Sequence, residues 1–211
     1  MKKTLSIFAV IMIFTAAIFS QGFKVKATGE QTFNFADERG RNQVTFFSAA
    51  PVEDITGLSG AIKGNVTFNV NDIKTLKGSF TVPVASIKTG IEMRDGHLQG
   101  ANWLNAEAYP EITFVIKKVS DVKSLADNKL SAKVTGDFSL HGVKKEVIAN
   151  ATLTYLDESE QTKMRAPGDL LGVQAKFNVK LSEYDVKNQL IGQKVAENIE
   201  VSVNIVGNNA K

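Results

Sequence analysis

The sequence predicts an all-β protein of eight or nine antiparallel strands, and three observations support this. Apolar and polar residues alternate through most of the chain, which gives each predicted strand one apolar and one polar face. These segments lack the continuous apolar runs of a parallel sheet that is buried on both faces. Turn signals such as Asp127-Asn128 and His141-Gly142 separate one strand from the next.

The strands differ in how clearly they alternate. Clear strands are expected at residues 66–70, 80–84, 112–116, 130–140, 147–155, 173–181 and 199–205. Weaker strands are expected at 32–36 and 43–50. Residues 92–107 break the alternation and predict a loop with one or two helical turns, while residues 158–170 form a polar connector. A sheet of this size hides its apolar face by closing into a barrel or by folding into a sandwich, and the alternation fits both.

The N-terminus has the order of a secretory signal peptide. Lys2 and Lys3 precede an apolar run from Leu5 to Phe19, and small or polar residues follow. The run is shorter than the ~20 residues that a membrane-spanning helix needs. We therefore expect a signal peptide at residues 1–22 and a mature domain at 23–211, in the periplasm or secreted. An uncleaved anchor and a cut after Ala27 are the alternatives.

Composition excludes several classes of protein. The absence of cysteine excludes disulfides, thiolate nucleophiles, cysteine-ligated metals and a lipidated cysteine. Without Lys2 and Lys3 the mature chain has 23 basic residues against 22 acidic ones, a formal charge of +1. Basic residues do not cluster with aromatic ones, so nucleic acid is not expected as a partner.

The apolar faces mix large and small side chains, and this leaves two interpretations open. Small residues that face large ones can simply complete a filled, tapered core. Alternatively they leave room for one ligand, since eight strands is the size at which a barrel is either filled or holds a small ligand. The large residues are Phe68, Phe80, Phe114, Phe138 and Phe177, and the small ones are Ala132, Gly136, Ala149, Ala151 and Ala175.

The same alternation also fits an outer-membrane barrel with its apolar face toward lipid. Such barrels carry aromatic girdles, yet this chain has three tyrosines and one tryptophan. It also ends in the polar residues 207–211 instead of a strand with a terminal aromatic residue. The sequence therefore favours a barrel or sandwich with an apolar interior.

The densest polar cluster lies at residues 94–98. His97 beside Asp95 could act as a general base and its orienting group, but Arg94 and Asp95 are more simply explained as partners of loop backbone groups. The second histidine, His141, precedes Gly142 in a predicted hairpin turn, where Gly142 supplies a positive φ. Two histidines without a supporting spacing predict no metal site.

Several segments together resemble a known family. They are Ala85-Ser86-Ile87-Lys88-Thr89-Gly90, Arg94-Asp95-Gly96-His97-Leu98, Tyr109-Pro110-Glu111-Ile112-Thr113-Phe114, residues 136–145 and residues 200–205. Their order and spacing resemble the YceI-like family of bacterial polyisoprenoid-binding proteins, from about residue 30 to residue 206. The chain departs from the family pattern at residues 102–105 and in the polar insertion at 158–170.

The resemblance implies an extended, lipocalin-like antiparallel barrel of about eight strands with a short helical loop insertion. It also implies an apolar tunnel that takes a polyisoprenoid or an isoprenoid quinone, with no required cofactor, no catalysis and no stable membrane insertion after signal cleavage. The expected function is a carrier or store of this lipid in the cell envelope. Whether the protein forms a homodimer is left open by the sequence. Candidate tunnel-lining residues on the inward face are Phe80, Val82, Phe114, Ile116, Phe138, Leu153 and Phe177.

Two other functions remain as alternatives. One is a stress-associated structural protein of the envelope with a filled core. The other is a lipid-modifying enzyme that uses His97 and Asp95.

Overall fold

The computed structural model describes residues 21–210, so the predicted signal peptide, apart from Gln21 and Gly22, lies outside the described residues. Ten strands form one antiparallel sheet. They are β1 (Glu30–Asn34), β2 (Gln43–Ser48), β3 (Ile55–Ser59), β4 (Lys63–Asn69), β5 (Asp72–Pro83), β6 (Glu111–Ala126), β7 (Lys129–Leu140), β8 (Val143–Leu156), β9 (Leu170–Lys180) and β10 (Asn198–Asn208). The helices are α1 (Glu92–Gln99), α2 (Glu160–Lys163) and the 3-10 turns η1 (Val84–Ser86) and η2 (Leu181–Tyr184).

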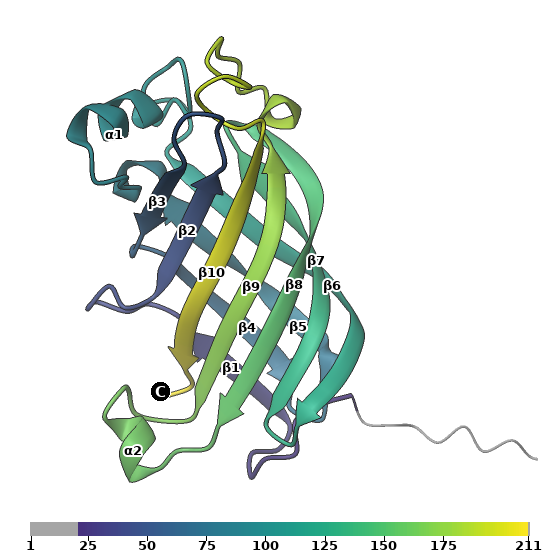
Figure 1. Ribbon diagram of the computed structural model, residues 1–211. Coiled ribbons are helices and arrows are strands. Elements are labelled where there is room, and N and C mark those ends of the chain that lie inside the picture. Colours follow the sequence, from purple (N-terminus) through teal and green to yellow (C-terminus); the bar gives the residue numbers. More distant parts are fainter. Residues whose placement is uncertain (1–20, 211) are drawn as a thin grey trace, which may run out of the picture.

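Eight of the strands close into a barrel, as the family resemblance implied (Figure 1). Neighbours follow the order β1-β4-β5-β6-β7-β8-β9-β10, and β1 closes the ring by pairing Asn34 with Asn208 of β10. The β2–β3 hairpin continues along the remaining edge of β10. The predicted loop at 92–107 contains α1, and the predicted connector at 158–170 contains α2. We call the two ends of the barrel the α1 end and the α2 end.

Three strand predictions were incomplete. The strand predicted at 112–116 is only the first part of β6, whose second half carries several lysines and polar residues. β3 was missed because it has only five residues and includes Gly57, too little for an alternating pattern. The segment predicted at 80–84 is only the last part of β5, whose first half carries Lys74, Thr75 and Lys77 among its apolar residues. Gly78, with φ of 148°, interrupts the alternation in the middle of that strand.

Aromatic side chains fill the α2 end of the barrel. Phe23, Phe33, Phe68 and Tyr155 are at most 2% exposed. Their ring centroids lie 5.5–5.9 Å apart in tilted, stacked and edge-on pairs, distances at which aromatic rings attract one another. This end is therefore a solid core.

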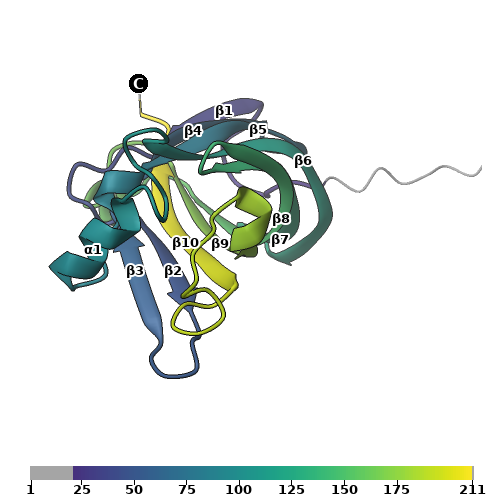
Figure 2. The ribbon, with the colours of Figure 1, turned by 90° about the horizontal axis from the view of Figure 1, so that it is seen from above.

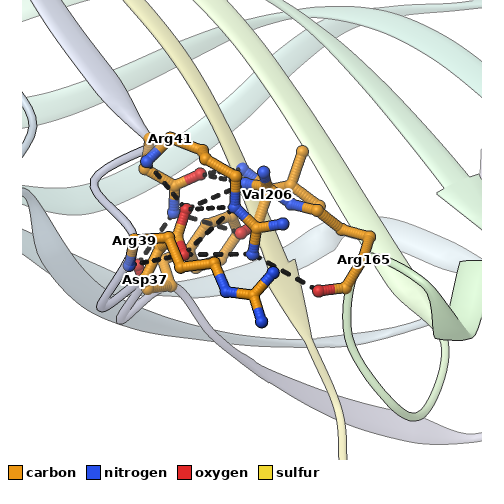
Figure 3. A network of polar contacts seen from close by, with 7 residues as sticks. Asp37, Arg39, Arg41, Arg165 and Val206 are labelled. Carbon is orange, nitrogen blue, oxygen red and sulfur yellow. Dashed lines mark hydrogen bonds and ion pairs between the residues drawn. The ribbon is translucent and has the colours of Figure 1, made fainter.

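A buried amide completes the wall where β10 passes from β1 to β2 (Figure 3). The side chain of Asn42 accepts a hydrogen bond from Val206 N–H (2.8 Å) and donates to the Val206 carbonyl (3.1 Å). It also donates to the carbonyl of Phe35 (2.9 Å). The side chain of Asn42 thus bonds to β10 between the pairings with β1 and β2, as a neighbouring strand would. Without it, backbone groups would be buried there without hydrogen-bond partners.

The polar insertion at residues 158–170, which contains α2, is bonded to Asn42 as well. Arg165 donates to Asn42 Oδ1 (3.1 Å) and pairs with Asp37 (3.2 Å). Burial raises the pKa of Asp37, but hydrogen bonds from Arg41 and Arg39 and the charge of Arg165 outweigh it, so this pKa lies below its ordinary value. The polar insertion therefore anchors the wall of the barrel.

Candidate functional site

An apolar cavity of about 220 Å³ lies inside the barrel, between the aromatic core of the α2 end and the segments of the α1 end. Of the described residues around it, only Thr45, Ser59, Thr113 and, through its indole N–H, Trp103 have polar groups in their side chains. An apolar cavity of ~150 Å³ already stays dry and takes up benzene, so a cavity of this size and lining favours an apolar ligand over water. The apolar faces point inward, opposite to an outer-membrane barrel, whose interior is polar.

All seven residues predicted from the inward face of the strands lie around this cavity. They are Phe80, Val82, Phe114, Ile116, Phe138, Leu153 and Phe177. Phe80, Phe114 and Ile116 point inward yet keep part of their surface accessible, because open space lies beside them. Their contact with a ligand stays a prediction.

The small residues of the inward face prove to be of two kinds. A Cβ added to Gly136 would meet Phe114 Cζ at 2.5 Å, so the ring of Phe114 already occupies that space. Ala132 is buried in the core at the α2 end. Ala149, Ala151 and Ala175, in contrast, border the cavity. Tapered packing thus explains the first two residues, and open volume explains the other three.

Sequence reasoning missed a second group of residues around the cavity. Leu98, Trp103 and Leu104 come from the segment between β5 and β6, and Phe46 comes from β2. Strand alternation carries no information about a loop that folds over the end of a barrel. The helical turns predicted within residues 92–107 were the only signal for this segment.

The single polar side chain of the cavity that is fully buried, Ser59, is already hydrogen-bonded. Ser86 donates its hydroxyl proton to the Pro83 carbonyl (2.5 Å), so Ser59 donates to Ser86 Oγ (2.7 Å). Ser59 also accepts from Ala61 N–H (3.1 Å). These bonds join β3 to η1 and satisfy the hydroxyl without a ligand.

Arg94 and Asp95 of the motif at residues 94–98 make loop contacts of the kind expected from sequence. Asp95 is 7% exposed and accepts hydrogen bonds from the backbone N–H and the hydroxyl of Thr89, both at 2.7 Å. These bonds are the main reason that the pKa of Asp95 is below its ordinary value. Arg94 donates to Thr89 Oγ1 (3.1 Å) and pairs with Glu53 (2.8 Å), which ties α1 to the β2–β3 turn.

The structure does not bring together the acid–base pair considered from sequence. No hydrogen bond or ion pair joins Asp95 to His97 within residues 21–210, and His97 is exposed on α1. His141 and Gly142 form the predicted hairpin turn, with φ of 52° and 77°. His141 Nδ1 lies 3.2 Å from the carbonyl oxygen of Tyr184, which can only accept, so Nδ1 carries the proton.

Between residues 21 and 210, no three histidine or carboxylate side chains are grouped as a metal ion would require. None of the helices in this part of the chain is both long and apolar enough to span a membrane.

Comparison with known proteins gives relatives along the whole barrel. A family model described as "YceI-like domain" matches residues 26–207. Protein YceI of Escherichia coli is 28% identical over 193 residues, which cover 90% of each chain. A UPF0312 protein of Pseudomonas fluorescens is 35% identical over 98 residues, and the match covers 46% of this chain and only 50% of that relative.

Solved structures share the fold. BcnA of Burkholderia cenocepacia superposes with a TM-score of 0.64 at 19% identity, over 81% of this chain and 99% of that one. A protein described as a polyisoprenoid binding domain from Saccharophagus degradans superposes with a TM-score of 0.61 at 13% identity, over 87% of this chain and all of that one. At these identities the likeness concerns the fold, whereas the family model covers nearly the whole described chain. The chain therefore belongs to the YceI-like family.

Proposed function

We propose that this protein binds a long isoprenoid lipid, a polyisoprenoid or an isoprenoid quinone, inside its barrel. The observation that carries the proposal is the cavity of about 220 Å³, which is surrounded by apolar side chains. Membership of the YceI-like family and the structural likeness to a polyisoprenoid binding domain support the choice of an isoprenoid.

Hydrocarbon burial supplies enough free energy for such binding. Each CH₂-sized group removed from water contributes about 0.8 kcal/mol, so one five-carbon isoprene unit contributes about 4 kcal/mol. Several units therefore offset the 4–15 kcal/mol that association costs in lost freedom, estimated roughly. A ligand of this kind needs few polar contacts, in agreement with the lining of the cavity.

The proposed role is that of a carrier or store in the cell envelope, as a binding protein and not an enzyme. Asp95 is engaged by Thr89 and Ser59 by Ser86, so the polar groups of this end serve the fold. Location in the periplasm or outside the cell rests on the signal-like residues 1–22. Cell fractionation with sequencing of the mature N-terminus tests the location.

Binding is tested in two ways. Native mass spectrometry of protein purified gently from its host is expected to show a co-purifying apolar molecule. Titration of ligand-free protein with a short-tailed isoprenoid quinone is expected to quench the fluorescence of Trp103, the only tryptophan, which borders the cavity. No bound molecule together with no quenching would refute the proposal.

A further inference from the structure

The barrel wall is incomplete on one side of the α1 end. β8 and β9 pair only between Asn150–Leu156 and Leu170–Lys176. Beyond that, residues 143–149 of β8 pair only with β7, and residues 177–180 of β9 pair only with β10. The facing edges of β8 and β9 therefore have no strand between them over the half of the barrel that holds the cavity.

One short segment fills this gap, and we call it the plug, residues 181–186. Seen from the α1 end, the yellow-green turn η2 lies over the barrel opening between β8 and β10 (Figure 2). Leu181 and Val186 of the plug border the cavity. Tyr184 packs its ring edge-on against Phe138, with centroids 5.6 Å apart. At this place the wall beside the cavity is thus made by side chains of the plug and not by hydrogen-bonded strands.

A hydroxyl inside the plug is buried without a partner. Tyr184 is 1% exposed, and among the described residues its hydroxyl has no hydrogen-bond partner. Burial is the main reason that the pKa of Tyr184 rises to about 12, so the group is a neutral donor. Tyr155, in contrast, is 0% exposed and donates its hydroxyl to Asp169 (2.6 Å). An unpartnered buried hydroxyl destabilises the closed plug relative to any state in which water reaches it.

The plug is held to β8 by few polar contacts. His141, at the turn between β7 and β8, donates from Nδ1 to the carbonyl of Tyr184 (3.2 Å). The other polar bonds of the plug stay within the β9–β10 connection, from Ser182 to Glu197 and from Leu181 N–H to the Glu197 carbonyl. The rest of this connection is tied elsewhere, from Asn188 to the Asn102 carbonyl (3.2 Å) and from Ala196 N–H to Ser48 Oγ (2.8 Å). Residues 181–186 are therefore the part that can move away from β8 once the bond from His141 is broken.

We infer that residues 181–186 form a gate, which swings away from β8 to let an apolar ligand pass between β8 and β9. The hydrogen bond from His141 holds the gate closed, and we call His141 the latch. The hydroxyl of Tyr184, which is buried without a hydrogen-bond partner and is called the dry hydroxyl below, favours opening. The inference rests on the proposed function for the identity of the ligand. The gate itself can be measured without any ligand.

The chain has no cysteine, so a single introduced thiol reports opening. Ala149→Cys places the thiol on the part of β8 that is not paired with β9, in the same buried cluster as Tyr184 and Val186. Ala132→Cys is the matched control, since Ala132 is equally buried but lies in the other core cluster, opposite Ala151, where β8 and β9 are paired. In otherwise unchanged, ligand-free protein, a thiol reagent is expected to label position 149 at least about tenfold faster than position 132.

Three further substitutions distinguish opening of the gate from a general loss of stability. Tyr184→Phe removes the dry hydroxyl without changing the ring, and is expected to slow labelling at position 149 by about tenfold, the order of one unmade buried hydrogen bond. His141→Gly keeps the positive φ but removes the latch, and is expected to speed this labelling. Tyr155→Phe breaks a satisfied hydrogen bond, so it is expected to lower Tm without slowing labelling.

Uptake of the ligand then connects the gate to binding. The rate at which a short-tailed isoprenoid quinone quenches Trp103 is expected to fall in Tyr184→Phe and rise in His141→Gly. Equal labelling at positions 149 and 132, or a Tyr184→Phe variant that labels as fast as the parent protein, would overturn the gate. If labelling behaves as expected but the quinone never quenches Trp103 and no apolar molecule co-purifies, the gate stands and the proposed ligand is wrong.

Discussion

A pair of identical substitutions decides whether the interior is hollow or filled. Ala175 of β9 borders the cavity and keeps part of its surface accessible, whereas Ala132 of β7 is buried in the core at the α2 end. Both alanines lie on inward faces of the barrel. We therefore expect Ala175→Leu and Ala132→Leu to change the free energy of unfolding in opposite directions.

The magnitudes follow from the space beside each residue. Leucine adds three carbons, which contribute about 2.4 kcal/mol when buried in open space. Fixing the leucine rotamer costs about 0.5–1 kcal/mol. Ala175→Leu should therefore stabilise ligand-free protein by about 1–2 kcal/mol, and it should weaken ligand binding because it occupies the cavity. Ala132→Leu has no free space and should destabilise the protein by about 1–3 kcal/mol.

Urea unfolding of delipidated protein measures both changes, and an unchanged m-value shows that the unfolded state is not altered. Titration with a short-tailed isoprenoid quinone measures the loss of binding in Ala175→Leu. If Ala175→Leu destabilises the protein as much as Ala132→Leu does, the interior is filled. The stress-associated structural protein considered from sequence would then be the better hypothesis.

Three further predictions concern packing, pH and ligand removal. Gly136→Ala would place a Cβ 2.5 Å from Phe114 Cζ and 2.7 Å from the Val115 carbonyl oxygen, so urea unfolding should show a loss of about 1–3 kcal/mol, and an unchanged stability would contradict the packing described here. Because the pKa of Asp37 lies below 3.8 in the folded protein, its carboxylate stabilises the fold fully above pH 3.8, and this contribution is lost as pH falls through the lower folded pKa. The stability difference between the parent protein and Asp37→Asn should therefore shrink below pH 3.8, and a difference independent of pH would count against the contacts in Figure 3. Removal of the bound lipid should lower Tm by roughly 5–10 °C in a thermal melt if ligand was present at about 100 times its Kd, and readdition should restore Tm.

The sequence by itself determined which side of each long strand faces inward, because side chains alternate with a period of two. It therefore identified Phe80, Phe114, Phe138 and the other predicted residues that border the cavity. It also determined the His141-Gly142 turn, since two positive φ angles in a two-residue hairpin are a local property of the backbone.

Only the tertiary structure decided how the barrel closes and where its interior is hollow. Asn42 bonds to Val206, 164 residues away, and neither residue carries a local signal of that contact. The sequence does not distinguish Gly136, whose space holds the ring of Phe114, from Ala175, which borders open volume. The gap between β8 and β9 and the plug that fills it likewise depend on how far two strands stay paired. Each of these features is set by contacts between distant segments, and alternation within one segment carries no information about them.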